Sequence, residues 1–124
     1  MKMYEVLALQ SFYTSIQDKK MPIKTTYKLS RLMRRVENEL EFYSKEFAKI
    51  VDTYALKENG ELVYSDDMTS IKIIPGKEDE CSDKIYELKE IEVDLSEFKF
   101  SIEEFENLDL TIAEMSSIYP LIAE

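Results

Sequence analysis

Apolar residues near the start of the chain recur at helical spacing. Four of them are three or four residues apart: Val6, Leu9, Tyr13 and Ile16. A helix over residues 3–17 would place them on one face. Pro22 follows in the stretch DKKMPIK, and proline cannot continue a helix and restricts the residue before it. We therefore predict a first helix that ends before Pro22.

A second and much longer helical pattern follows. Eight apolar residues alternate at spacings of four and three: Leu29, Met33, Val36, Leu40, Tyr43, Phe47, Ile50 and Tyr54. We call this set the heptad seam, because the two spacings together repeat every seven residues. No glycine or proline interrupts Thr26–Leu56. The pattern predicts a helix about 45 Å long, capped by Thr25 or Thr26 and ended by Gly60 in a left-handed turn.

The first predicted helix is about half as long as the second, so it can cover only part of the seam. The C-terminal half of the chain or a second copy must cover the rest. The residues that we expect to be packed in this way, or to form an interface, are Leu40, Tyr43, Phe47 and Ile50.

Shorter patterns fill the region between residues 57 and 90. Residues 62–64 and 70–74 are strand-like and flank the turn-forming SDD, which predicts a β-hairpin. Residues 78–90 place Cys81, Ile85 and Leu88 on one helical face. We therefore expect a hairpin followed by a third helix.

The last third of the chain combines alternation with helix-start signals. Apolar residues alternate with charged ones in IEVDL and in FKF, but at odd positions in the first segment and at even positions in the second. A turn at Ser96-Glu97 would allow the apolar residues of both segments to face the same side. Ser101 with Glu104, and Thr111 with Glu114, have the spacing of capping boxes and predict two short helices.

These elements predict an α+β protein with an N-terminal helical hairpin, one long helix, a small antiparallel sheet and further short helices. At 124 residues the chain has the size of one domain. We expect a single domain over residues 1–124, with the hairpin in residues 1–56 and a small α+β portion in residues 57–124.

Charge is distributed unevenly along the chain. The stretch KKMPIKTTYKLSRLMRRV, residues 19–36, carries seven cations and no acid, although the net charge of the whole chain is −10. An acidic surface repels nucleic acid and anionic membranes, so we expect neither as a direct partner. No apolar run is long enough to span a bilayer, and the N-terminus does not resemble a signal peptide.

The cations of the long helix stand at the end where the helix dipole disfavours them. Four of them form a candidate binding face: Lys28, Arg31, Arg34 and Arg35. Three kinds of contact could compensate: acids folding back from the C-terminal half, acids of another copy in a homo-oligomer, or a separate ligand. Conversely, a candidate acidic patch could imitate nucleic acid toward a host protein. It comprises Asp66, Asp67, Glu78, Asp79, Glu80 and Asp83.

The sequence offers little for catalysis. It has no histidine, so the usual general base and zinc ligand are missing, and two glycines do not make a phosphate loop. Its single cysteine, Cys81, has no activating partner and falls on an apolar helix face. Glu97 and Lys99, with Asp79, Asp83 or Asp94 upstream, match a nuclease metal site only loosely. We predict no catalysis, no metal and no cofactor.

Two segments carry a family resemblance: MPIKTTYKLSRLMRRVENELEFY and EIEVDLSEFKFSIEEFENLDLTIAEMSSIYPLI. Their layout resembles a family of small acidic proteins of unknown function encoded by tailed phages of Gram-positive bacteria. The resemblance implies a phage setting, in the host cytoplasm or the virion, but no activity or assigned site.

We therefore expect a non-enzymatic phage accessory protein that binds proteins or takes part in assembly. Its partner would be another copy, another phage protein or a host enzyme. The alternative is an acidic inhibitor of a host nucleic-acid-binding or defence enzyme, and a distant third hypothesis is a metal-dependent nuclease.

Overall fold

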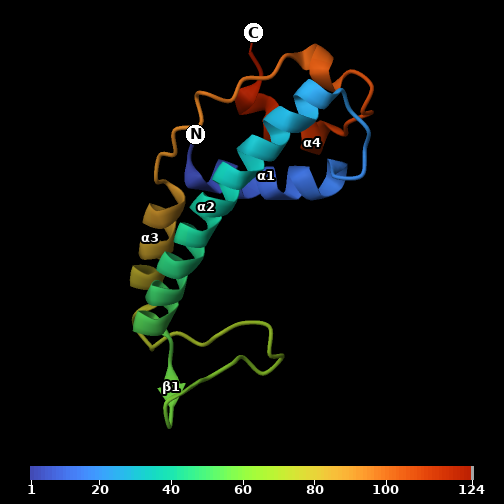
Figure 1. Ribbon diagram of the computed structural model, residues 1–124. Coiled ribbons are helices and arrows are strands. Elements are labelled where there is room, and N and C mark those ends of the chain that lie inside the picture. Colours follow the sequence, from blue (N-terminus) through green and yellow to red (C-terminus); the bar gives the residue numbers. More distant parts are fainter. Residues whose placement is uncertain (124) are drawn as a thin grey trace. The chain divides into compact units, whose positions relative to one another are not determined.

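The computed structural model describes residues 1–123, and the chain divides into two compact units. Unit one contains residues 1–41 together with the chain from Ile91 onward, and unit two contains residues 42–90. The fold is α+β, with an N-terminal helical hairpin and a two-stranded antiparallel sheet, as predicted (Figure 1). The expectation of one domain over residues 1–124 stays a prediction.

The helical hairpin is formed by α1 (Met3–Ile16) and α2 (Ile23–Tyr54). Helix α2 begins directly after Pro22, whose carbonyl accepts the Thr26 N–H at 3.1 Å. The predicted cap was wrong, because Thr25 lies inside the helix and is buried there. Proline has no N–H to lose and a fixed φ, so it suits the residue at a helix start.

Helix α1 buries a wider arc than its predicted face. Its buried residues are Met3, Val6, Leu9, Phe12 and Ile16. Phe12 replaces Tyr13, which is exposed. Two features explain why Phe12 is buried and Tyr13 is exposed. Helix α1 also packs against α4 (Ile112–Ile118), and the Phe12 ring has no hydroxyl that needs a hydrogen-bond partner.

An aromatic cluster joins α1 to the C-terminal part of unit one. Phe105, in the 3₁₀ helix η1 (Ile102–Phe105), lies 6.1 Å from Phe12 and 5.4 Å from Phe100 between ring centroids. Its edge-to-face contact with Phe12 is a favoured aromatic geometry. All three rings are buried, so they form much of the core of unit one.

Backbone hydrogen bonds hold the extended segment 91–100 at both ends. Near its start, the Val93 N–H donates to the Met1 carbonyl at 2.7 Å; at its end, the Phe100 N–H donates to the Leu121 carbonyl at 2.9 Å. Between them, the Phe98 N–H donates to the Leu95 carbonyl at 3.0 Å and closes a turn. This confirms the turn at Ser96-Glu97.

Both predicted capping boxes are present. The Ser101 N–H donates to Glu104 at 2.8 Å at the start of η1, and the Thr111 N–H donates to Glu114 at 2.9 Å at the start of α4. A second 3₁₀ helix, η2 (Tyr119–Leu121), follows α4. Local pairing of side chain with backbone therefore defines where these short helices begin.

The two-stranded hairpin of unit two lies earlier in the chain than the predicted one. Strands β1 (Lys57–Glu58) and β2 (Glu61–Leu62) pair antiparallel around Asn59 and Gly60, whose φ angles are +52° and +81°. Two successive positive φ angles define a type I′ turn, for which Asn-Gly is the preferred sequence. Gly60 therefore belongs to a hairpin and does not end α2, and the predicted strands meet only through a Tyr64–Ile71 bridge.

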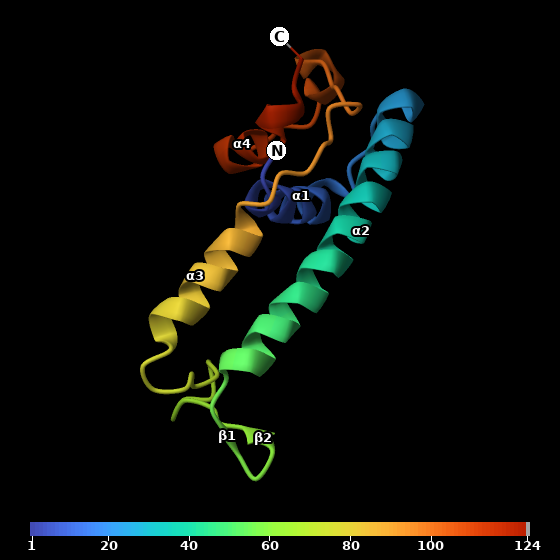
Figure 2. The ribbon, with the colours of Figure 1, turned by 90° about the vertical axis from the view of Figure 1, so that its left-hand side faces the viewer.

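Helix α3 (Glu78–Lys89) runs back alongside the C-terminal part of α2 in unit two (Figures 1 and 2). Cys81 and Leu88 of α3 are buried. On α2, the rings of Tyr43 and Phe47 stack with centroids 5.8 Å apart. The seam residues Leu40, Tyr43, Phe47 and Ile50 are each half-buried, in contrast to the fully buried Leu29, Met33 and Val36.

The aromatic cluster gives a direct stability test. Phe105→Ala should lower the free energy of unfolding by about 3–5 kcal/mol, because it removes a buried ring and leaves a cavity. The matched control is Ile102→Ala in the same 3₁₀ helix, where the side chain is 57% exposed and the expected change is within about 0.5 kcal/mol. Urea denaturation followed by circular dichroism measures both, and equal effects would contradict the assigned core.

Candidate functional site

Lys28 is the one member of the predicted basic face that pairs with a carboxylate of the C-terminal segment, among residues 1–123. Its ammonium lies 3.0 and 3.1 Å from the two oxygens of Glu104, and 4.5 Å from the centre of the Phe100 ring. The same carboxylate accepts the Thr25 hydroxyl at 3.2 Å and the Ser101 N–H at 2.8 Å. Glu104 thus accepts hydrogen bonds from α2, through Thr25 and Lys28, and from the start of η1, through Ser101.

The Glu104 contacts also alter its acidity. Partial burial pushes the pKa of Glu104 upward, but the bonds from Lys28, Ser101 and Thr25 favour the ionised form and together outweigh it. The pKa is therefore below its ordinary value of 4.5. Thr25 is only 2% exposed, so its hydroxyl depends on this carboxylate for a partner.

The three arginines of the predicted face lack such C-terminal partners. Arg35 pairs with Glu39 of its own helix at 3.2 Å, and the Arg31 guanidinium lies 5.9 Å from the centre of the Tyr27 ring. Arg34 is exposed and makes no ion pair with any residue between 1 and 123. Among residues 1–123, an ion pair with the C-terminal half therefore forms for Lys28 alone, while Arg35 acts on Asp94 only through its charge.

The uncompensated cations share one exposed side of α2 with two large apolar residues. Ile23 is 84% exposed and Tyr27 is 63% exposed. Successive residues of a helix are about 100° apart around its axis, so Ile23, Tyr27 and the cations near them fall within about a quarter to a third of the helix circumference. We call this surface the α2 face: Ile23, Lys24, Tyr27, Arg31 and Arg34. Our sequence interpretation missed Ile23 and Tyr27, although the spacing of four from Ile23 to Tyr27 and of four from Tyr27 to Arg31 was a usable signal.

The predicted acidic patch falls in two parts of unit two. Asp66 and Asp67 lie in the turn at residues 65–70, where Asp67 accepts bonds from the Ser65 hydroxyl and from Thr69. These bonds, from Ser65 first and then Thr69, lower the pKa of Asp67 to about 2. Asp67 is therefore part of the turn, and Asp66 is exposed beside it.

The other four acids of the patch belong to α3, and two of them have local partners. Glu78 accepts the Gly76 N–H at 2.9 Å. Glu80 lies 3.6 Å from the Lys77 ammonium, and it accepts a hydrogen bond from the Tyr54 hydroxyl. The pKa of Tyr54 is raised, first by partial burial of its hydroxyl and second by the negative charge of Glu80.

Asp79 and Asp83 make no ion pair with any of residues 1–123. Together with Tyr86, which is 64% exposed, they lie on the side of α3 opposite its buried residues. We call this surface the α3 face: Asp79, Asp83 and Tyr86.

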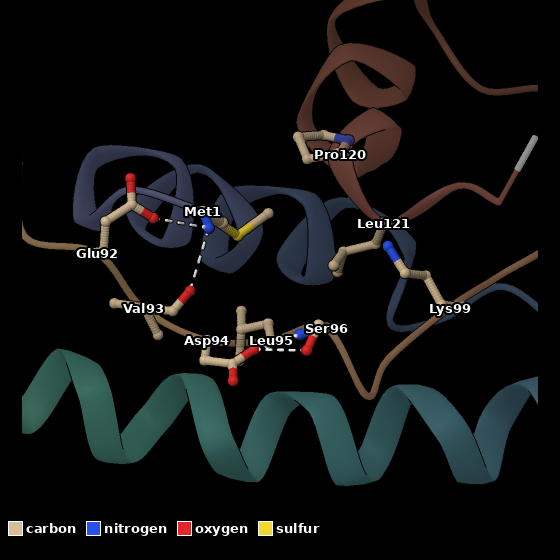
Figure 3. A pocket seen from close by; sticks show the side chains of 9 residues that line it. All are labelled: Met1, Glu92, Val93, Asp94, Leu95, Ser96, Lys99, Pro120 and Leu121. Atoms are coloured by element: carbon tan, nitrogen blue, oxygen red, sulfur yellow. Dashed lines mark hydrogen bonds and ion pairs between the residues drawn. The ribbon is translucent and has the colours of Figure 1, made fainter.

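Unit one also contains an open pocket of about 360 Å³ near the start of the chain (Figure 3). The Met1 ammonium lies 3.3 Å from Glu92 and 3.1 Å from the Val93 carbonyl. Across the pocket, Asp94 accepts the Ser96 hydroxyl at 2.6 Å and the Ser96 N–H at 3.0 Å. Its polar groups are thus largely paired with one another.

This pocket contains part of the predicted nuclease pattern. Hydrogen bonds from Ser96, with smaller contributions from Arg35 and the N-terminus, lower the pKa of Asp94. Lys99 lines the pocket, whereas Glu97 does not. Within residues 1–123, no group of three or more His, Cys, Asp or Glu side chains is placed to hold a metal ion.

Comparison with protein-family models, with curated proteins and with solved structures finds no match for this chain. In the part of the chain that the structure describes, no helix has both the length and the apolar character needed to cross a membrane.

Glu104→Gln tests the Glu104 contacts through pH. The folded-state pKa of Glu104 is lowered, so its stabilisation is present above pH 4.5 and is lost as the pH falls through the folded-state pKa. At pH 7 the variant should lose about 1–2 kcal/mol of unfolding free energy. That deficit should shrink toward zero as the pH falls below the folded-state pKa, as measured by urea denaturation across a pH series.

Glu103→Gln is the matched control, because the neighbouring Glu103 side chain is exposed. It should change stability little at any pH. A deficit for Glu104→Gln that stays constant with pH would show that the carboxylate charge contributes nothing.

Proposed function

We propose that this protein is a non-enzymatic accessory component of a tailed phage, acting by binding other proteins in the virion or during its assembly. The phage setting is supported by the resemblance of the two long segments described above. The mode of action is supported by one structural observation, the α2 face.

The α2 face has the composition of a protein-binding surface. Tyrosine and arginine are enriched at the centres of protein interfaces, and here Tyr27 is exposed beside Arg31 and Arg34. Exposed apolar side chains among cations, without a single acid between residues 19 and 36, favour an acidic protein surface as partner. The net charge of −10 disfavours nucleic acid and anionic membranes.

A second candidate function is inhibition of a host enzyme by nucleic-acid mimicry. The α3 face favours it, because Asp79 and Asp83 are exposed without ion pairs among residues 1–123. Against it, Glu80 is paired with Lys77, and Lys84 with Glu87, on the flanks of the same helix. Only Asp66, Asp79 and Asp83 of the six predicted acids lack the internal bonds described above, so mimicry is the weaker proposal.

Affinity capture tests the proposed function. The tagged protein is produced in Gram-positive cells during phage growth, and co-purifying proteins are quantified by mass spectrometry. Arg31→Glu combined with Arg34→Glu should reduce recovery of the partner by about tenfold or more, because it reverses both exposed guanidinium groups. Tyr27→Ala should reduce recovery without lowering the melting temperature, since the ring is exposed.

The charge-matched control is Lys72→Glu combined with Lys99→Glu, both exposed and outside the α2 face. It should recover the partner as the unaltered protein does. If the two double variants recover the same proteins, the α2 face is not the binding surface. Recovery of a host nuclease or polymerase that is lost with Asp79→Lys and Asp83→Lys would instead establish mimicry.

A further inference from the structure

We propose that the α2 face of one copy binds the α3 face of a second copy, so that copies of the chain join head to tail. This inference rests on the proposed protein-binding function and names the partner of the same surface. Its basis is that the two faces are complementary in charge, in apolar content and in spacing.

The charges without ion pairs on the α2 face and on the α3 face have opposite signs. On α2, Lys28 and Arg35 are paired internally, with Glu104 and Glu39. Lys24, Arg31 and Arg34 are the cations of its exposed side, and none has an ion pair among residues 1–123. Directly before α3, Lys77 is paired with Glu80, and within α3 Lys84 is paired with Glu87.

What remains on α3 is Asp79 and Asp83, both exposed. The α2 face is therefore cationic and the α3 face anionic, while Glu37 of α2 and Lys89 of α3 also have no ion pair among residues 1–123. Complementary potentials of this kind steer association and fix the orientation of two surfaces.

The spacing of the two faces defines a register. Tyr27 and Arg34 are seven residues apart on α2, and Tyr86 and Asp79 are seven residues apart on α3. Seven residues correspond to about 10 Å of helix in each case. An antiparallel pairing of the two helices therefore places Tyr27 opposite Tyr86 and Arg34 opposite Asp79.

The same register brings Arg31 near Asp83, since these residues lie four positions after Tyr27 and three before Tyr86. The contact would bury two tyrosines that are now 63% and 64% exposed and flank them with two ion pairs. Buried tyrosine with a rim of charge is a common interface arrangement.

Each copy carries one α2 face and one α3 face, so the contact joins two different surfaces. Contacts of this type generate rings if they close and open chains if they do not. The faces are short, and an interface below about 1,200 Å² is typical of weak association. We therefore expect assembly at high micromolar concentration and low salt.

A charge-swap experiment tests the pairing. Variant A carries Arg31→Glu and Arg34→Glu, which makes both of its faces acidic. Variant B carries Asp79→Lys and Asp83→Lys, which makes both of its faces basic. Sedimentation velocity is measured from about 0.01 to 1 mM protein, for each variant alone, for the equimolar mixture, and for the unaltered protein at about 0.05 and 0.5 M salt.

The unaltered protein should exceed the single-chain mass of 14.6 kDa as its concentration rises, and high salt should reverse this. A alone and B alone should each remain at the single-chain mass. Their mixture should associate again, because the acidic α2 face of A meets the basic α3 face of B. Circular dichroism verifies that A and B keep their helices, and a chain carrying all four substitutions, which should self-associate, provides a second check.

Several outcomes would overturn the pairing. One is a single-chain mass for the unaltered protein up to about 1 mM at low salt, and another is a mixture that fails to associate although both variants are folded. Binding of a short DNA duplex by the unaltered protein, lost in variant A, would assign the α2 face to nucleic acid. Failure of self-association alone would leave the proposed function standing if affinity capture still recovers another protein through the α2 face.

Discussion

The fold depends on the fact that α2 contains no residue that could break it. Its 32 residues include neither glycine nor proline, so the helix continues for about 48 Å. One short neighbouring helix cannot cover an apolar seam of that length. Separate parts of the chain therefore pack against it: α1 and the segment after Ile91 in unit one, and α3 in unit two.

The two units cover the seam to different degrees, and the difference follows from how many elements each provides. In unit one, which also contains α1, α4 and the segment hydrogen-bonded at both ends, the seam residues Leu29, Met33 and Val36 are buried. In unit two a single helix and a small hairpin leave Tyr43 and Phe47 half-buried. Low burial implies low local stability, so we regard unit two as the less stable part of the protein.

Features controlled by neighbouring residues could be predicted from the sequence. The heptad seam, the two capping boxes and the turn at Ser96-Glu97 each depend on residues within one or two helical turns, and all are present. Gly60 was misassigned because a glycine with positive φ suits both a helix end and a type I′ turn. The positive φ of Asn59, directly before Gly60, identifies the type I′ turn, because a helix end requires only one residue with positive φ.

Contacts between distant residues could not be predicted in this way. Glu104 lies 79 residues from Thr25 and 76 from Lys28, and no spacing rule selects it over neighbouring Glu103 or Glu106. For the same reason the sequence grouped Lys28 with Arg31, Arg34 and Arg35 as one binding face. The fold uses Lys28 and Arg35 internally, and it leaves Arg31 and Arg34 beside an exposed tyrosine that the heptad seam does not include.

This partition explains why the inverted charge of α2 persists in a stable fold. An exposed cation in the first turn of a helix is destabilising by a few tenths of a kcal/mol, and Lys24 lies in that turn of α2. Lys28, one turn further on, is paired with Glu104. Among residues 1–123, Lys24, Arg31 and Arg34 have no ion pair, although the Arg31 guanidinium lies 5.9 Å from the centre of the Tyr27 ring. The N-terminal half of α2 thus holds Lys28 and Arg35 in internal ion pairs and leaves Lys24, Arg31 and Arg34 without an ion pair among residues 1–123.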